Sequence, residues 1–294
     1  MKYIEPKALK KGDTIEFIAP AGVIENKSAI ERAKNYFEDL GYKVKYSKHL
    51  FGKSNYMSGQ DFERLEDLHN AFADKDVSAI ICARGGYGCL RLIKDIDYEI
   101  IKNNPKIFCG YSDITVLSAM FLKRANLITY SSPMAKGDFG AENISQYTVS
   151  NFFNAVEKMG KLSFKSEKIY NAGTVSGILF GGNLSSVVSL CGIDFIPDEK
   201  FIFFTEDINE PVYKIDKMLT QLFNIEKFRS NICGIITGDF LDNGYPEQLD
   251  ELFRVFGSEY NLPVYGGFKI THEDDKITLP YGKNASIKDG VLTV

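Results

Sequence analysis

The segment 106–120, KIFCGYSDITVLSAM, decides the fold class of this chain. Residues 106–110 form a short apolar run that predicts a buried strand, and residues 114–124 carry apolar side chains at helical spacing. Tyr111, Ser112 and Asp113 therefore fall on a tight strand-to-helix turn. Such turns are typical of an α/β sheet whose strands are joined by crossover helices.

The first half of the chain repeats this alternation. Strands are predicted at 14–19, 43–47, 79–83, 106–110 and 127–130, and helices at 28–40, 61–73, 90–93, 114–124 and 148–159. We therefore predict an N-terminal α/β domain over residues 1–159, with a mainly parallel sheet flanked by helices.

The second half is denser in strands. Strands are predicted at 174–180, 201–205, 232–237, 263–265, 276–279 and 290–294, and helices at 184–191, 212–223 and 248–256. Because 160–171 shows no clear period, we place a linker there and a smaller, strand-rich C-terminal α/β domain over residues 172–294.

Composition narrows the class of protein. The chain has 294 residues, 44% hydrophobic and 25% charged, which is ordinary for a globular protein with two domains. Its net charge of -4, without a long run of like charges, argues against nucleic acid as a partner. The charged N-terminus and the lack of an apolar run of ~18 residues predict no membrane association and a cytoplasmic location.

The cysteines and histidines give no sign of a metal site. The five cysteines form no CxxC pair, and the three histidines show no metal-ligand spacing. We therefore expect buried free thiols, no metal and no cofactor.

Ser112 has the placement of a nucleophile. A serine at a strand-to-helix turn is exposed above the sheet edge, and the following backbone N–H groups can stabilise an oxyanion. The alternative is that Ser112 or Asp113 only caps the helix, and the second glycine of a GxSxG elbow is missing. The local residues alone leave both interpretations open.

A second loop, 84–88 (RGGYG), follows another buried strand. Its glycines allow the backbone to approach a ligand closely, although it matches neither the dinucleotide-binding nor the phosphate-loop pattern. An ordinary turn is the alternative. In a parallel sheet, this loop and Ser112 lie at the same carboxyl edge, where open α/β folds bind ligands.

The second half supplies candidates for a base and its partner. The apolar run 201–204 ends in Thr205, Glu206 and Asp207, and a carboxylate in this position needs solvent or a partner. His272 lies in a polar loop and is the histidine best placed to act as a base, because an ordinary pKa near 6.5 suits proton transfer at neutral pH. A plain surface histidine is the alternative.

Together these segments resemble the LD-carboxypeptidase family of serine peptidases, which includes muramoyltetrapeptide carboxypeptidases and microcin C self-immunity hydrolases. The resemblance covers nearly the whole chain. It rests on 12–13, 18–22, 56–59, 64–72, 83–88, 110–115, 181–184, 206–216, 272 and 279–282.

The resemblance implies a Ser-Glu-His triad of Ser112, Glu206 and His272, with the serine on the N-terminal domain and its partners on the C-terminal domain. It also implies an oxyanion hole formed by the backbone N–H groups of Asp113 and Gly86. The implied reaction releases the terminal D-alanine of a cytoplasmic murein tetrapeptide, a small muropeptide, by cleaving its L,D-peptide bond. The family further suggests a homodimer.

A carboxypeptidase must bind a free carboxylate, and the loop with Arg84, Gly85 and Tyr87 is the candidate for this contact. The sequence departs from the family at 130–134, YSSPM in place of His-Gly-Pro-Met, and around His272, where Thr271 and Glu273 replace glycines. The first departure bears on substrate contacts and the second on loop flexibility.

Two other functions are weighed against this one. A microcin-type immunity hydrolase would act on peptidyl or aminoacyl nucleotide analogues, but that branch tends to have a longer segment between the serine and the glutamate. A non-catalytic small-molecule binding protein would have no need for Ser112, Glu206 and His272 together.

Overall fold

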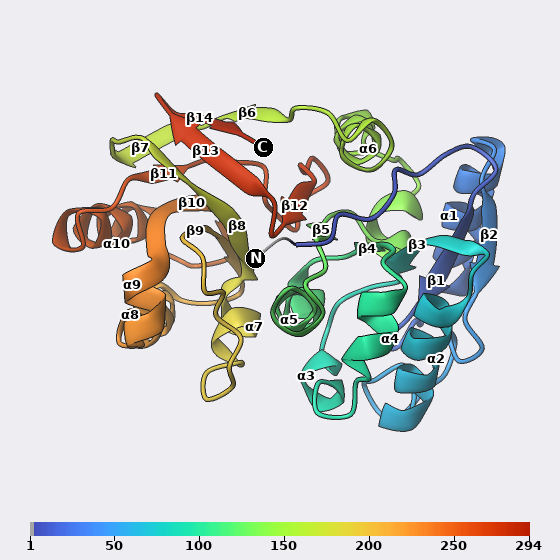
Figure 1. Cartoon of the computed structure of the whole chain (residues 1–294). Helices are drawn as coiled ribbons and strands as arrows, with labels where there is room; N and C mark the ends of the chain where they lie inside the picture. Colours follow the sequence, from blue (N-terminus) through green and yellow to red (C-terminus); the bar gives the residue numbers. More distant parts are fainter. Residues whose placement is uncertain (1–2) are drawn as a thin grey trace.

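The computed structural model describes residues 3–294 and contains two sheets that lie side by side (Figure 1). The first sheet has six strands in the order β12-β5-β4-β3-β1-β2. Their bounds are β1 Thr14–Ile18, β2 Lys43–Tyr46, β3 Val77–Cys82, β4 Ile107–Cys109, β5 Thr129–Ser131 and β12 Leu279–Tyr281. Strands β1 to β5 are parallel, and β12 joins β5 in antiparallel register.

Helices cover both faces of this sheet. They are α1 Lys27–Asp39, α2 Asp61–Ala73, α3 Cys89–Leu92, α4 Tyr98–Asn103, α5 Thr115–Met120 and α6 Gln146–Phe153. Alternate strand residues pack on opposite sides, so Ile81 and Cys109 belong to a core with α1 and α6, whereas Ile80 and Phe108 pack with α2 and α5. Burial on both faces explains why the strands read as continuous apolar runs.

The second sheet has eight strands in the order β6-β14-β13-β8-β9-β10-β11-β7. Their bounds are β6 Ser163–Lys165, β7 Lys168–Asn171, β8 Val175–Asn183, β9 Phe201–Ile208, β10 Ile232–Leu241, β11 Val264–Gly266, β13 Asn284–Lys288 and β14 Val291–Thr293. Its centre, from β8 to β11, is parallel, and its edges are antiparallel. Its helices are α7 Leu184–Val188, α8 Val212–Phe223, α9 Glu226–Asn231 and α10 Pro246–Glu259.

The α/β class with two sheets is confirmed, and three details differ from the sequence prediction. The segment 160–171, expected as a linker, contains the short strands β6 and β7. The strand expected at 276–279 begins only at Leu279 and joins the first sheet, because Lys276 turns its side chain into the contact between the halves. Helices α4 and α9 and strand β13 were not predicted.

The two halves share one continuous core. Buried residues of α5, such as Leu117, belong to the same hydrophobic cluster as Leu184 and Val187 of α7. Thr115 Oγ1 also accepts a hydrogen bond of 3.2 Å from the backbone N–H of Asn183. The start of α5, which follows Ser112, is therefore fixed directly against the second sheet.

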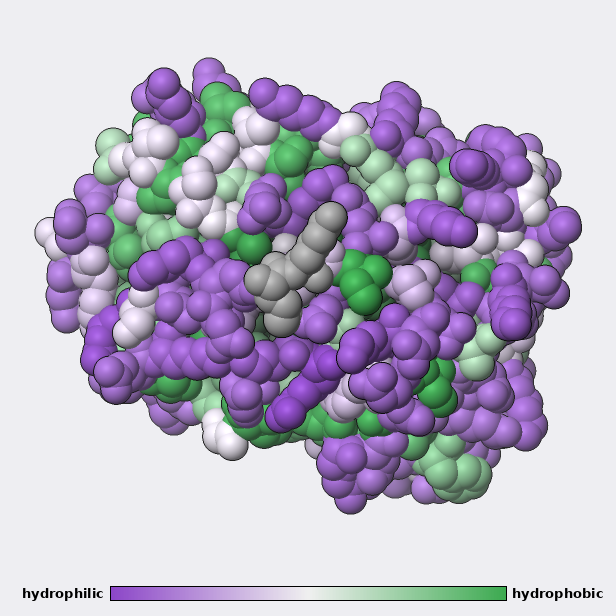
Figure 2. Space-filling model, in the orientation of Figure 1, coloured by the Kyte–Doolittle hydropathy of each residue, from purple (hydrophilic) through white to green (hydrophobic). Residues whose placement is uncertain are grey.

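The surface is mainly hydrophilic with scattered hydrophobic residues on the face shown in Figure 2. Within residues 3–294, no helix is both long and apolar enough to cross a membrane.

Candidate active site

Ser112 occupies a strained turn after β4. Its φ is +61°, in the left-handed region that costs a non-glycine residue about 1–2 kcal/mol. It opens the single 3₁₀ turn Ser112–Ile114, which continues into α5. Strain of this kind persists where the surrounding structure holds a functional side chain in place.

The capping alternative for Ser112 and Asp113 is not what the structure shows. Neither the 3₁₀ turn nor α5 has a side-chain hydrogen bond at its start. Instead, Asp113 Oδ2 accepts a 2.9 Å hydrogen bond from the backbone N–H of Cys89, the first residue of α3. Asp113 thus ties the turn that begins at Ser112 to the end of the glycine loop.

The glycine loop packs against Ser112. A Cβ on Gly85 would lie 2.9 Å from Ser112 Cβ and 3.0 Å from its Oγ, so only glycine allows this approach. Gly86 has a φ of +121°, which a side chain would strain. The loop therefore presents its backbone directly beside the serine hydroxyl.

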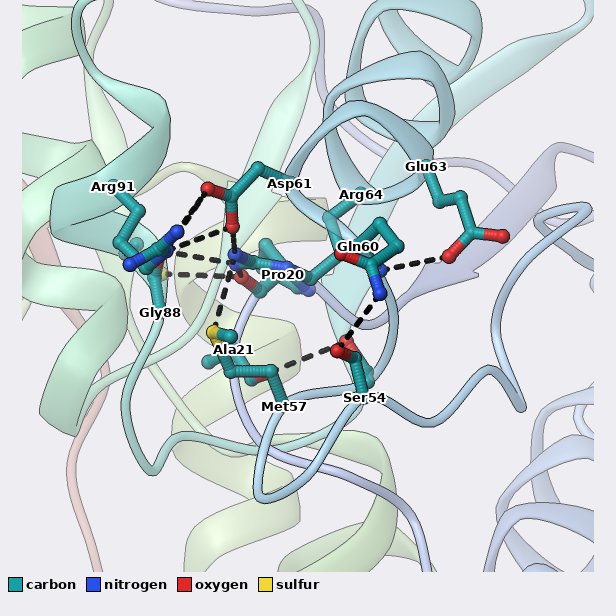
Figure 3. Close-up of polar contacts among 12 residues, drawn as sticks. Pro20, Ala21, Ser54, Met57, Gln60, Asp61, Glu63, Arg64, Gly88 and Arg91 are labelled. Carbon is teal, nitrogen blue, oxygen red and sulfur yellow. Dashed lines mark hydrogen bonds and ion pairs between the residues drawn. The ribbon is translucent and has the colours of Figure 1, made fainter.

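The buried side chain of Arg64 supports the glycine loop, residues 84–88 (Figure 3). Arg64 Nη1 donates to the carbonyl of Gly88 at 2.9 Å and also to the carbonyl of Pro20. Asp61 pairs with Arg64 and, through a contact of 2.7 Å, with Arg91. This network fixes the carboxyl end of the loop, whose position governs the backbone N–H groups near Ser112.

Glu206 and His272 face each other from the second half of the chain. Glu206 lies near the end of β9 with its side chain only 3% exposed, and its Oε2 lies 2.9 Å from Nδ1 of His272. The neighbouring Asp207 is occupied elsewhere, because it accepts hydrogen bonds from Asn183 Nδ2 at 2.9 Å and from the backbone N–H of Ser185 at 2.8 Å. Of the two adjacent carboxylates, Glu206 is the partner of the imidazole.

The pKa values of His272 and Glu206 are both shifted from their usual values. Burial on its own would lower the pKa of His272, but the adjacent carboxylate of Glu206 outweighs it and raises that pKa above its usual value. Burial raises the pKa of Glu206, and the facing imidazole opposes this effect. The contact at Nδ1 leaves Nε2 as the ring nitrogen available for proton transfer.

The loop that carries His272 is held across the contact between the two halves. Lys276 and Asp138 form a buried ion pair with side chains 4% and 6% exposed. Lys276 Nζ also lies 4.7 Å from the ring centre of Tyr111, whose ring meets His272 edge-to-face at 5.0 Å. The backbone N–H of Lys276 donates to Thr148 Oγ1 at 2.8 Å.

A cavity of about 340 Å³ brings the candidates together. It is lined by Asn26, Ala29, Arg32, Arg84, Gly85, Gly86, Tyr111, Ser112, Met134, Lys136, Gly137, Gly140, Ala141 and His272. Ser112 and His272 thus face one cavity from opposite halves of the chain. Tyr87 does not line this cavity; the residue is 44% exposed, and its ring centre lies 5.9 Å from that of Tyr56.

Several residues of this site were missed from the sequence. Tyr111 could have been found from its place beside Ser112, and Lys136 from its place just after the unusual segment 130–134. Arg32 and Asp138 gave no sequence signal, because only the packing of α1 and of residues 135–139 brings them to the site. In the part of the chain that the structure describes, no group of three or more His, Cys, Asp or Glu side chains could hold a metal ion.

Both halves of this chain match known protein families. Residues 15–132 match the model of the LD-carboxypeptidase N-terminal domain, and residues 176–287 match that of the C-terminal domain. A probable murein peptide carboxypeptidase of Bacillus subtilis is 36% identical over 98% of this chain and 93% of its own length.

Two solved structures are also similar along nearly their full length. A MccF-like protein of Bacillus anthracis has a TM-score of 0.91 and 27% identity, covering 99% of each chain. A muramoyltetrapeptide carboxypeptidase of Oxalobacter formigenes has a TM-score of 0.84 and 28% identity, covering 95% of this chain and 97% of its own. With both domain models matched in order and a relative at 36% identity, this chain belongs to the LD-carboxypeptidase family of hydrolases.

Proposed function

We propose that this chain is a serine LD-carboxypeptidase that releases the terminal D-alanine from murein tetrapeptides. The observation that carries the proposal is the Glu206–His272 contact of 2.9 Å, in a site where His272 shares a cavity with the strained Ser112. The name of the Bacillus subtilis relative supports the substrate class.

The proposed reaction proceeds through an acyl-enzyme. His272 Nε2 takes the proton of the Ser112 hydroxyl as Oγ attacks the carbonyl carbon of the L,D-peptide bond. The imidazolium, stabilised by Glu206, then gives that proton to the nitrogen of the departing D-alanine. Water, deprotonated by the same imidazole, attacks the ester and releases the shortened peptide, and the proton returns to Ser112.

Two backbone N–H groups are proposed to stabilise the oxyanion, those of Gly86 and Asp113. The support is their position on either side of the serine: Gly86 follows the glycine that packs on Ser112, and Asp113 is the next residue in the chain. Donors fixed before the reaction stabilise developing charge without reorganisation.

Arg84 is proposed to bind the terminal carboxylate of the substrate. It lines the cavity next to Gly85, and its guanidinium is oriented by hydrogen bonds to the carbonyls of Gly85 and Val23. Tyr87 is proposed to contact a more distant part of the substrate, since its ring lies on the exposed side of the same loop. We further propose a cytoplasmic location, a homodimer that light scattering would detect, and no need for a cofactor.

Replacing the nucleophile tests the reaction. The variant Ser112→Ala should fold normally, because it removes only the hydroxyl, and should release no D-alanine from the tetrapeptide. Thermal unfolding serves as the control for folding. Release at the wild-type rate would remove Ser112 from the mechanism.

A microcin-type immunity hydrolase is the second candidate, favoured by the similarity to the MccF-like structure. Turnover of a murein tetrapeptide and of an aminoacyl sulfamoyl adenosine should be compared with the same enzyme. Preference for the nucleotide analogue would support this alternative, and binding of either compound without turnover would support a non-catalytic binding protein.

A further inference from the structure

The cavity beside Ser112 holds more positive charge than one carboxylate requires. Arg32, Arg84 and Lys136 line it, and no aspartate or glutamate among residues 3–294 does so. The positive charge of this wall therefore favours an anionic ligand. Three cations can bind more than one anionic group of that ligand.

The two arginines are oriented without being neutralised. Arg84 donates from Nε to the carbonyl of Gly85 at 3.1 Å and from Nη1 to the carbonyl of Val23 at 3.0 Å. Arg32 donates from Nε to the carbonyl of Gly140 at 2.8 Å. These neutral acceptors fix each guanidinium and leave further N–H donors for a ligand.

Lys136 is the least satisfied of the three cations. Its Nζ has no hydrogen-bond acceptor and no carboxylate within ion-pair distance among the described residues. Burial lowers the pKa of Lys136, the charge of Arg84 lowers it further, and the exposed Glu25 only partly opposes them. An anion that binds beside such an unpaired, partly buried ammonium stabilises its charged form.

Three other sheltered cations of this protein have carboxylate partners. Lys276 pairs with Asp138, Arg64 pairs with Asp61, and Lys123, with a side chain 12% exposed, lies 3.3 Å from Asp194. Lys106 is also buried without an ion pair, but its Nζ donates to the carbonyls of Asp74 and Val77. Lys136 differs from all of these cations because its Nζ has neither a carboxylate partner nor a hydrogen-bond acceptor among the described residues.

We propose that Arg32 and Lys136 form a subsite for a second substrate carboxylate, one carried by the side chain of the residue that precedes the scissile bond. The inference rests on the proposed function, in which Arg84 binds the carboxylate of the terminal D-alanine. That leaving group has no other anionic group, so the second carboxylate must come from the acyl side. Arg32 and Lys136 line the same cavity of about 340 Å³ as Ser112, so the substrate group that they meet lies close to the cleaved bond.

The test uses two tetrapeptides that differ in one charge. One carries diaminopimelate as the third residue, with its free side-chain carboxylate, and the other carries the same residue with that group converted to a carboxamide. The wild-type enzyme should prefer the acid in kcat/KM by about ten- to a hundredfold, as for loss of a hydrogen bond to a charged group.

The variant Lys136→Met should reduce this preference to within about threefold of unity while still cleaving the amide, because it removes the ammonium and no side-chain hydrogen bond. Arg32→Gln should reduce it in the same direction. The matched control is Arg254→Gln, which removes an exposed cation of α10 and should keep the wild-type preference.

Equal cleavage of both peptides by the wild type, or an unchanged preference in Lys136→Met, would overturn the subsite and leave the carboxypeptidase assignment intact. If neither peptide is cleaved, the proposed function fails instead. Calorimetric binding of the same two peptides to Ser112→Ala then decides the subsite: tighter binding of the acid supports it, and equal binding refutes it.

Discussion

The buried pair of Lys276 and Asp138 offers the sharpest test of how the two halves hold the site together. Both side chains are almost fully buried, at 4% and 6% exposure, and they come from different halves of the chain. Removing one partner leaves an uncompensated buried charge, which costs about 3–5 kcal/mol. An exposed pair contributes only about 0.2–1 kcal/mol.

The variant Asp138→Asn should therefore lower the free energy of unfolding by about 3–5 kcal/mol. At about 2–4 °C per kcal/mol, the expected fall in Tm is about 6–20 °C, with the lower half of the range favoured for a chain of this size. The matched control is Glu251→Gln, which breaks an exposed pair with Arg254 whose side chains are 65% and 54% exposed. Differential scanning calorimetry should show a change below about 1 kcal/mol for the control.

The double variant Asp138→Leu with Lys276→Met removes both charges and should recover most of the lost stability. It should also change the pH profile. The positive charge of Lys276 lowers the pKa of His272, so its removal raises that pKa, and the acidic limb of kcat/KM should move to higher pH. Glu206 and Tyr111 contact this imidazole, the charge of Asp207 raises its pKa from further away, and all three residues remain in place.

Two results would refute this reasoning. A cost for Asp138→Asn no larger than that of the exposed control would show that the pair is not buried as described. An acidic limb that stays in place or moves to lower pH in the double variant would show that Lys276 does not act on His272.

Three further predictions concern the site itself. Gly85→Ala should lower kcat at least about a hundredfold, because its Cβ would lie 2.9 Å from Ser112 Cβ, whereas Gly160→Ala, with open space around it, should match the wild type in the same assay. Glu206→Gln should reduce kcat by about 10²–10⁴-fold and, since it removes the charge that raises the pKa of His272, move the acidic limb to lower pH; a shift upward in the rate profile contradicts it. Ser112→Gly and Ser112→Ala should both be inactive, but the glycine variant should be about 0.5–1 kcal/mol more stable in urea unfolding because it relieves the left-handed φ, and equal stabilities would argue against strain.

The relation between the glycine loop and the nucleophile gives Asp113 and Arg64 a shared role. Asp113 binds the backbone N–H of Cys89, and Arg64 binds the carbonyl of Gly88, so the loop is held at two adjacent residues. The loop that presents the Gly86 N–H is thus fixed by buried side chains rather than by its own flexible residues. This is the preorganisation that the proposed oxyanion stabilisation requires.

The sequence by itself determined the class of fold and located Ser112 as the candidate nucleophile. Buried parallel strands such as Ile107–Cys109 and amphipathic helices such as Lys27–Asp39 have local periods that one chain segment displays. The turn at Ser112 and the carboxylate at the end of β9 are also local features, visible as a polar residue that ends an apolar run. The family resemblance added the pairing of Ser112, Glu206 and His272, which no local pattern could supply.

Apart from that resemblance, only the tertiary structure decided which of two adjacent carboxylates faces the imidazole. Glu206 and Asp207 are equivalent in the sequence, but successive residues of a strand point to opposite faces, and only one face of β9 meets His272. The same holds for the cation-lined wall and for the Lys276–Asp138 pair. Their residues lie far apart in the chain and meet through packing between elements, and the periodicity of a segment carries no information about such contacts.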